Sequence, residues 1–318
     1  MAPKRLWTVV AISAVIAIAC AFALPLVGPT NISYGRAWAG VMPDTAILFD
    51  VRVPRVILAM LTGAALAVSG VLFQALVRDA LATPYTLGVS SGASLGAVVA
   101  ICFGIPAVWL SSMAGAGFIL FLVLGIATHR RGLSPFTLLL AGVTINSICM
   151  ALIMFLHSFA TFGQSFAISR WLMGGIEPVS KVTLGWLALC VVPLSVYCFA
   201  RSRDWNLLAV GDEWAASRGV DARRMLVEGY VIGSILTGAV NALTGPVGFV
   251  GLIVPHALRL AFGADHRLLI PSSVLLGASF LAICDTISQI VVAPSEIPVG
   301  VITALLGGPF FIWILRTR

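Results

Sequence analysis

The residue types that could perform acid–base, metal or phosphate chemistry are few in this sequence and are scattered along it. It contains no HExxH pair, no GxSxG nucleophile turn and no GxxxxGK[ST] phosphate-binding loop. The four histidines fall in different loops or at helix ends, where they are poor candidates for a shared metal: His129, His157, His256 and His266. We therefore expect no catalytic residue, no metal site, no cofactor and no ATP binding within this chain.

Cysteines and one aspartate are the remaining candidates. The six cysteines lie inside apolar runs without a CxxC pair, which is typical of small buried side chains: Cys20, Cys102, Cys149, Cys190, Cys198 and Cys284. Asp285 is the only carboxylate plainly inside a predicted membrane span, where any ionisable residue is a candidate functional site. Because no partner for it is visible, a hydrogen-bonded structural role explains it better than acid–base catalysis.

The elements that must position these residues are membrane helices. The chain has 318 residues, is 60% hydrophobic and 10% charged, and has a mean hydropathy of +1.07, which is typical of an all-α polytopic membrane protein. A bilayer core of about 30 Å takes about 20 helical residues, which predicts ten spans in a single transmembrane domain, residues 1–318. They lie near residues 6–26, 56–76, 87–105, 107–128, 136–157, 182–200, 227–244, 247–262, 268–292 and 297–315.

We expect the chain to lie in the plasma (inner) membrane, and the distribution of its positive residues favours an orientation with both termini in the cytoplasm. With the N-terminus inside, fourteen of the nineteen lysines and arginines are cytoplasmic, among them Arg130, Arg131 and Arg318. The outside keeps five: Arg36, Arg52, Arg55, Arg170 and Lys181. No basic face with interleaved aromatic residues suggests nucleic-acid binding.

The one long polar stretch in this apolar chain, Arg201 to Glu228, carries five arginines and five carboxylates. Within it, residues 203–225 are expected to form two short cytoplasmic helices. Asp212 can cap a first helix of about two turns, which ends at Arg218 before Gly219.

A second helix is expected to start at Asp221 and to run toward Met225. It places Arg223 and Arg224 in its first turns, where positive charge opposes the helix macrodipole. Local stability therefore explains these arginines poorly, and contact with another protein explains them better. A solvated loop that only fixes topology is the alternative.

Small residues repeat along the span predicted near residues 87–105. Gly88, Gly92 and Gly96 recur every four residues and share one helix face, with Ser91 on another. This spacing lets helix backbones approach closely where lipid provides no hydrophobic drive for association. Packing and a role in a transport pathway both remain open.

Three polar stretches interrupt the apolar pattern. Thr83–Thr86 break the chain between two spans, and irregular backbone near membrane depth is tolerated only against protein or a cavity. Residues 161–181 are long enough outside the membrane for a short surface helix. Residues 294–298, also outside, contain Glu296.

Arg52 and Arg55 flank Pro54 immediately before the second span, on the outer side. Their spacing puts both on one side of the helix once it starts. Outer positive charge opposes the usual topology bias, so we expect it to dock acidic residues of an external partner. Pairing with Asp44, Asp50 or lipid headgroups is the alternative.

Taken together, these motifs resemble the FecCD-type permeases of type II ABC importers over nearly the whole chain. The resemblance rests on RVPR at 52–55, GAALAVSGVLFQALVRDALATPYTLGVSSGASLG at 63–96, LLLAG at 138–142, LLAVGDEWAASRGVD at 207–221, GPVGFVGLIVPHALR at 245–259 and EIPVGVITALLGGPFFIWIL at 296–315. It implies a ten-helix subunit that pairs with a second permease subunit, identical or related, around a shared substrate path.

The resemblance also implies partners. Two cytoplasmic ATPase subunits, which bind ATP and Mg, would grip the short helices, and a periplasmic substrate-binding protein would dock outside at Arg52 and Arg55. Coupling to the ATPases would fall to ten residues: Asp212, Glu213, Trp214, Ala215, Ala216, Ser217, Arg218, Gly219, Val220 and Asp221. The inner gate would include Asp79, Leu81, Ser134 and Pro135.

Two positions depart from the family pattern. The usual RNPL is RDAL at residues 78–81, which places the Asp79 carboxylate beside the proposed gate and removes a proline. Gln289 stands four residues after Asp285, where an arginine is frequent, and this leaves a third docking cation unsupported.

The sequence therefore predicts a permease subunit that moves an iron-siderophore-type metal chelate into the cytoplasm, powered by separate ATPase subunits. Siderophore is chosen only because it is the broadest branch of the family. Haem and cobalamin are alternatives, as, less favoured, is an oxyanion. From other classes, an ion-coupled secondary transporter would use Asp285 as its protonation site, and an intramembrane enzyme would turn over substrate without moving it.

Overall fold

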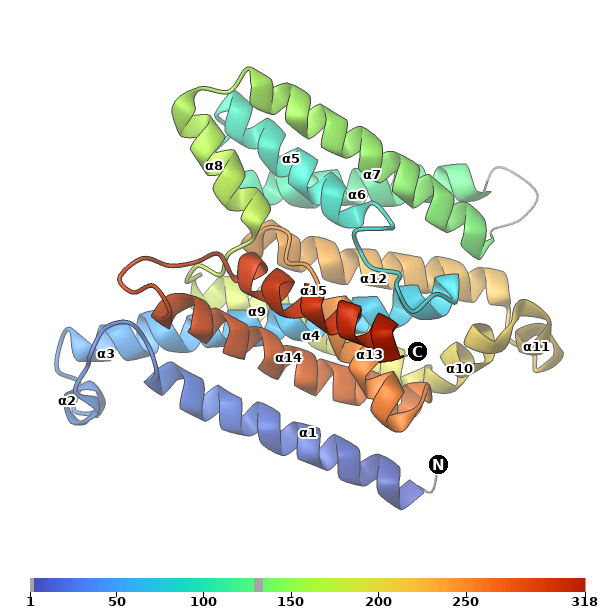
Figure 1. Ribbon diagram of the computed structural model, residues 1–318, viewed down its shortest axis with the longest axis horizontal. Helices are drawn as coiled ribbons and strands as arrows, with labels where there is room; N and C mark the ends of the chain where they lie inside the picture. Colours follow the sequence, from blue (N-terminus) through green and yellow to red (C-terminus); the bar gives the residue numbers. More distant parts are fainter. Residues whose placement is uncertain (1–2, 129–133, 318) are drawn as a thin grey trace.

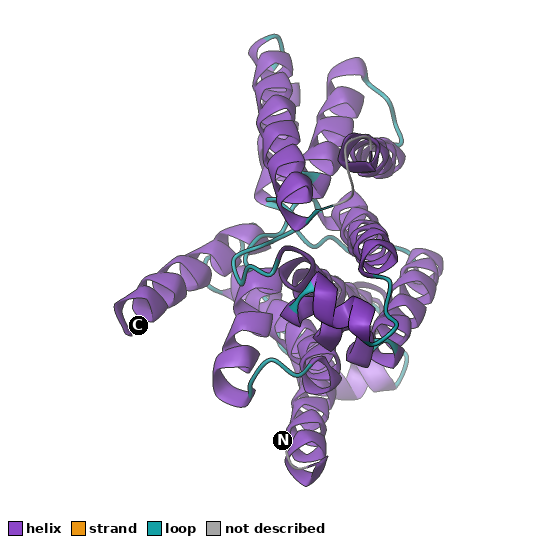
Figure 2. Ribbon diagram, turned by 90° about the vertical axis from the view of Figure 1, so that its right-hand side faces the viewer, coloured by secondary structure: helices purple, strands orange, loops and turns teal. Residues whose placement is uncertain are grey.

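The computed structural model describes residues 3–128 and 134–317, and every regular element in them is a helix (Figure 2). The predicted all-α fold class is confirmed. Four residues named above lie outside the described part: His129, Arg130, Arg131 and Arg318. The elements in chain order are α1 (Pro3–Ala23), η1 (Leu24–Leu26), α2 (Tyr34–Trp38), α3 (Asp44–Ala46), η2 (Ile47–Arg52), α4 (Val53–Val77), α5 (Val89–Phe103), α6 (Val108–Thr128), α7 (Pro135–Ser158), α8 (Phe162–Met173), α9 (Lys181–Ala200), α10 (Ser202–Val210), α11 (Asp212–Ser217), α12 (Ala222–Thr244), α13 (Val250–Phe262), α14 (His266–Ile290) and α15 (Val299–Thr317).

Ten apolar helices correspond to the ten predicted spans. Seven are long and apolar enough to cross a membrane, and the shorter ones are α5, α13 and the Val299–Phe310 part of α15. The spans predicted at 87–105 and 247–262 are too long, because α5 starts after Gly88 and α13 starts after Phe249, whose φ angles are 82° and 68°. At about 1.5 Å per residue, the 13 residues of α13 cover only about 20 Å of a core about 30 Å thick.

Helix α4 runs through the middle of the bundle and packs against α9, α12, α13 and α14 (Figure 1). Glycines allow two of these contacts to be backbone against backbone. A Cβ atom added to Gly63 would lie 2.1 Å from the carbonyl oxygen of Gly277 on α14, and one added to Gly70 would lie 1.9 Å from that of Gly251 on α13. Larger side chains at these positions would force the helices apart.

The predicted glycine repeat packs α5 against α6. A Cβ atom on Gly96 would lie 2.1 Å from the carbonyl oxygen of Ser111, and one on Gly92 would lie 2.3 Å from an isoleucine side chain of α6. Gly88 differs from the other two, because it precedes α5 with its positive φ. The buried hydroxyl of Ser91 donates to the Gly88 carbonyl at 2.9 Å. Gly92 and Gly96 therefore lie in a helix–helix contact within the chain.

The two ends of the bundle carry different elements. Helices α10 and α11 lie at one end with both chain termini, and we call this the α11 end; α2, α3 and α8 lie at the opposite, α8 end (Figure 1). Helix α8 is the surface helix expected between residues 161 and 181, and Thr161 and Gln164 cap it reciprocally. Helices α2, α3 and α10 were not predicted, because such short elements show too few apolar repeats.

Candidate functional site

The polar segment between α9 and α12 contains three helical parts rather than the two predicted. Helix α10 precedes α11, and α11 ends before Gly219, whose φ of 78° matches the expected left-handed stop. Asp212 was predicted to cap α11, but it is the first helical residue and no side chain caps this helix. Asp221 does act as a cap, accepting from the backbone N–H of Arg224 at 3.1 Å. The helix it starts is not separate but is the first turn of α12, because the apolar run that follows continues it.

The surface of this segment combines charge with an exposed aromatic residue. Trp214 is 58% exposed and Val210, four residues earlier, is also exposed, whereas Ala215 is fully buried. Val220 is half-buried, and the other predicted coupling residues are exposed: Asp212, Glu213, Ala216, Ser217, Arg218, Gly219 and Asp221. Tryptophan and arginine are, with tyrosine, the residue types enriched at the energetic centres of protein interfaces.

Asp212 forms an ion pair with Arg78. Arg78 follows the last residue of α4 and adopts a left-handed conformation with φ of 56°. Its Nε also donates to the carbonyl oxygen of Leu208, on α10, at 3.1 Å. A single arginine therefore joins the buried helix α4 to both short helices of the α11 end, a role that the sequence analysis missed.

A second connection joins α10 to the start of α14. The side-chain amide of Asn206 donates to Asp265 at 2.9 Å, and its oxygen accepts from the backbone N–H of His266 at 2.8 Å. Asp265 accepts from the backbone N–H of Arg267 at 3.0 Å and pairs with its guanidinium at 2.7 Å. These hydrogen bonds from Arg267 hold the pKa of the Asp265 carboxyl well below its usual value. A displacement of α10 would therefore be transmitted to α14 through Asn206 and to α4 through Arg78.

The four predicted gate residues lie at the same end, after α4 and before α7 (Figure 1). Asp79 accepts from the backbone N–H of Leu81 at 2.9 Å and closes a local turn that leaves the Leu81 side chain exposed. Ser134 caps α7 by accepting from the N–H of Thr137 at 3.1 Å, and Pro135 takes the first helical position. The Asp79 carboxylate, which replaces the usual asparagine side chain, therefore stabilises the turn in which it lies.

At the α8 end, Arg55 lies between two carboxylates that are distant in sequence, and we call Arg55, Asp285 and Glu296 the outer charge cluster. The Nε and Nη2 atoms of Arg55 donate to the two oxygens of Asp285 at 3.0 and 3.1 Å, and Nη1 donates to Glu296 at 3.0 Å. The side chains of Arg55 and Asp285 are 10% and 1% exposed, whereas that of Glu296 is 46% exposed. Gln289 donates to Asp285 at 2.8 Å.

This cluster corrects the expectation that Asp285 has no partner. Arg55 stands 230 residues earlier in the chain and holds both carboxylate oxygens. The sequence did contain one signal for this pair. A cation at the edge of one span and a carboxylate inside another each need an opposite charge nearby in a low dielectric, and each could supply it to the other. Gln289 replaces the frequent arginine with a neutral donor to the same carboxylate.

Arg52 is also buried, and its guanidinium donates to the carbonyl oxygen of Thr30. The alternative of pairing with Asp44 or Asp50 is wrong for both arginines. Those two carboxylates pair instead with other cations of the same end, Arg36 at 3.3 Å and Lys181 at 2.8 Å.

A cavity of about 660 Å³ lies beside α15, between α8, α13 and the chain before α5. Its lining includes Thr83 and Tyr85 from the irregular stretch, together with Phe249 and Leu305. Part of this irregular stretch therefore lines a cavity, which is one of the two surroundings in which such backbone is tolerated near membrane depth. Within the described residues, no group of three or more histidines, cysteines or carboxylates could hold a metal ion.

Comparison with known proteins places this arrangement among transport proteins. The sequence profile of the FecCD transport family matches residues 14–317. The chain is 38% identical over 301 residues to the hemin transport system permease protein HmuU of Yersinia pestis, covering 92% of this chain and 90% of that protein. It is 40% identical over 278 residues to the vitamin B12 import system permease protein BtuC of Escherichia coli O139:H28, covering 84% and 83%. A solved inward-facing structure of a metal-chelate type ABC transporter is 26% identical with a TM-score of 0.86, covering 98% of this chain and 100% of that chain.

Proposed function

Since this chain belongs to the FecCD transport family, we propose that it carries an iron-siderophore-type metal chelate across the plasma membrane into the cytoplasm. It is a multi-pass permease subunit of an ABC importer and has no catalytic activity of its own. ATP and Mg belong to partner ATPase subunits. The observation that carries the proposed mechanism is the exposed α11, tied through Asp212 and Arg78 to the buried helix α4.

The substrate class is supported by the names of the relatives. One is named for hemin and the other for vitamin B12, and both of these molecules are bulky metal chelates. The identities of 38% and 40% do not favour either, so haem and cobalamin are the alternatives within the class. Titration of the cognate binding protein with ferric siderophores, hemin and cobalamin, followed by absorbance, tests the choice. Tight binding of hemin or cobalamin, without binding of a ferric siderophore, would overturn it.

We assign the contact with the ATPase subunits to α11 and the turn after it, residues 212–221. The exposed Trp214 supplies contact area, and the connections through Arg78 and Asn206 give a displacement of this end two routes into the bundle. Nucleotide binding would then bias a helix interface with two arrangements, opening the inner and outer gates in turn. Asp79, Leu81, Ser134 and Pro135 lie at the proposed inner gate. Removal of residues 212–218 should abolish uptake and stimulated ATPase activity, and retention of both would refute this assignment.

The α11 end is then cytoplasmic, and the α8 end faces the periplasmic binding protein. The excess of lysine and arginine in the loops of the α11 end supports this orientation. A second permease subunit, identical or related, would complete the substrate path, and the cavity beside α15 is where we expect that path to run. Labelling of Trp214→Cys by an impermeant maleimide in inside-out vesicles, and not in right-side-out ones, tests the orientation.

We assign binding-protein docking to Arg52 and Arg55. Docking at Arg55 must exchange one internal carboxylate for an external one, because the guanidinium is already held by Asp285 and Glu296. Glu296 is the displaceable partner, since it lies in the loop after α14 and is half-exposed. Asp285 would keep Arg55 oriented during the exchange.

An ion-coupled secondary transporter with Asp285 as the protonation site is the alternative from another class. The bidentate pairing with Arg55 argues against it, because protonation of Asp285 would weaken the compensation of a buried cation. Gradient-driven transport by the purified chain alone in proteoliposomes would favour this alternative, whereas the importer requires its ATPase subunits.

A further inference from the structure

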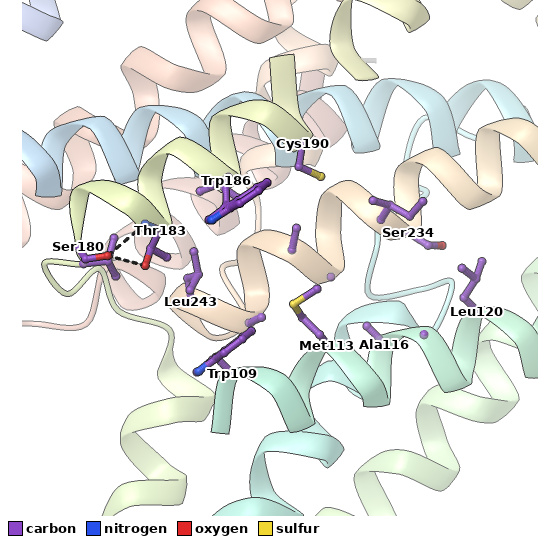
Figure 3. Close-up of a pocket in the computed structure, with 17 residues that line it drawn as sticks. Trp109, Met113, Ala116, Leu120, Ser180, Thr183, Trp186, Cys190, Ser234 and Leu243 are labelled. Atoms are coloured by element: carbon purple, nitrogen blue, oxygen red, sulfur yellow. Dashed lines mark hydrogen bonds between the residues drawn. The ribbon is translucent and has the colours of Figure 1, made fainter. Parts of the chain in front are cut away.

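A groove of about 740 Å³ lies on the outer half of the bundle between α6 and α9, with α12 as its floor (Figure 3). We propose that this groove binds one acyl chain of a phospholipid from the leaflet at the α8 end. The groove lies on a different side of the bundle from the proposed substrate path, because α15 is in front of α4 and α9 is behind it (Figure 1). The proposal does not depend on the transported substrate.

The groove exists because small side chains line its floor and one wall. Helix α12 contributes Gly238, Ala239 and Ala242, and α6 contributes Ala116 and Gly117. Helix α12 packs against both α6 and α9, and the groove runs between these two helices. A Cβ atom added to Gly117 would meet no other atom within 4 Å.

The lining offers apolar contact and little hydrogen bonding. Leu120, Leu187 and Leu243 are among the larger apolar side chains of the lining. The hydroxyls of Ser180 and Thr183 are engaged with each other at 2.8 Å, and Ser180 also accepts from the backbone N–H of Thr183 at 3.1 Å (Figure 3). All three helices are candidate membrane spans, and apolar cavities stay dry. Ser234 adds one further hydroxyl to a lining that is otherwise mainly apolar, so an acyl chain matches this groove better than water does.

The rim indicates how the chain enters. Trp109 and Trp186 stand on opposite walls near the starts of α6 and α9 (Figure 3), and both are largely exposed. Tryptophan is enriched at the level of the headgroups, which puts the mouth of the groove at that level. Lys181, next to the rim residue Ser180, has an exposed ammonium group 2.8 Å from Asp50. An exposed ion pair beside the rim suits the polar headgroup level of the leaflet, as the apolar walls of the groove suit an acyl chain.

Filling the groove tests the proposal. Gly117→Leu places a side chain in the open space, while Gly185→Leu adds the same group to α9 at an exposed glycine outside the lining, also with no atom within 4 Å of its Cβ. Native mass spectrometry after extended detergent washing should find one phospholipid fewer per chain on Gly117→Leu than on wild type or on Gly185→Leu. Equal retention by all three proteins would overturn the proposal.

A second measurement uses the unmodified protein. A phosphatidylglycerol with a diazirine near the end of one acyl chain, photolysed in proteoliposomes, should label peptides of α6, α9 and α12 that line the groove above those of the exposed helix α7. Uniform labelling of all lipid-facing helices would overturn the proposal. So would crosslinking of two copies through Cys190, which lines the groove, because a second subunit would then occupy it.

Discussion

Arg78, which ends α4 in a left-handed conformation, is ion-paired with Asp212, the first residue of α11. The pair joins a deeply buried helix of the bundle to a short helix that is largely exposed. Both side chains are partly exposed, at 31% and 49%, so the pair contributes little to stability, about 0–1 kcal/mol. Its proposed role is to transmit movement between α11 and α4.

Replacing either partner by alanine should therefore impair transport while leaving the stability of the fold almost unchanged. We expect Arg78→Ala and Asp212→Ala each to lower ATP-driven uptake several-fold while unfolding stability changes by less than about 1 kcal/mol. Because Arg78 also holds the Leu208 carbonyl, the double variant should be no worse than Arg78→Ala alone, since residues that act through one contact are not additive. Arg170→Ala, which breaks an exposed pair with Glu177 at the other end, is the control. Additive losses would show that the two residues act separately.

The buried pair of Arg55 and Asp285 should behave in the opposite way. Asp285→Ala leaves an insufficiently compensated buried cation and should destabilise the protein by about 3–5 kcal/mol. The double variant Arg55→Met with Asp285→Leu should recover much of that loss, because it removes both charges. Denaturant unfolding in detergent measures both. A fully stable Asp285→Ala protein would mean that Glu296 alone compensates Arg55.

Glu296→Gln should strengthen docking of the binding protein. The change keeps the shape of the side chain but removes the charge with which Glu296 competes for Arg55. Because Glu296 is half-exposed, its pair with Arg55 is worth about 0.5–1 kcal/mol, which corresponds to a factor of two to five in affinity. The gain should shrink at high salt. Glu177→Gln, a charge removal at the same end, is the control in the same affinity titration. Unchanged affinity for Glu296→Gln would exclude the exchange at Arg55.

Gly70→Ala should disrupt the contact between α4 and α13. Its new Cβ atom would lie 1.9 Å from a backbone oxygen, which cannot move aside as a side chain can, and overpacking of this kind costs about 1–3 kcal/mol or more. Gly185→Ala, where no atom lies within 4 Å of the added carbon, should have almost no effect. Thermal unfolding of the two variants distinguishes these outcomes.

Asp265 should make stability depend on pH at the acid side. Hydrogen bonds from Arg267 lower its pKa in the folded protein, so the stabilisation is present above the unfolded pKa of about 3.9 and is lost as the pH falls from there toward the lower folded value. Asp265→Asn should show a smaller decline of melting temperature on acidification below about pH 4 than wild type. Parallel curves would assign the acid sensitivity to other carboxylates.

The ten spans and the surface helix at 161–181 were predictable because they depend on apolar runs and capping residues, which are local signals. The left-handed stop at Gly219 and the cap at Asp221 were predictable for the same reason. The first turn of α12, which Asp221 caps, was predicted as a separate helix because it is polar while the rest of α12 is apolar. A helix continues through such a change in polarity when no residue breaks it.

The pairings at both ends were beyond a single sequence. Arg55 meets Asp285, and Arg78 meets Asp212, across 230 and 134 residues of chain, and nothing local marks which cation serves which carboxylate. Asp212 is an example. Its carboxylate is suited to cap a helix N-terminus, but in the fold it pairs with Arg78, which is distant in sequence.

The glycine contacts along α4 constrain how this molecule can move. Where one backbone rests directly on another, a helix cannot slip past its neighbour by even one residue, so α4, α13 and α14 should travel together as one block. Helices α5 to α8 form a separate group that meets the block chiefly through α12 (Figure 1). Rocking of one group against the other about α12, and not shear within the centre, is the motion that this packing leaves available.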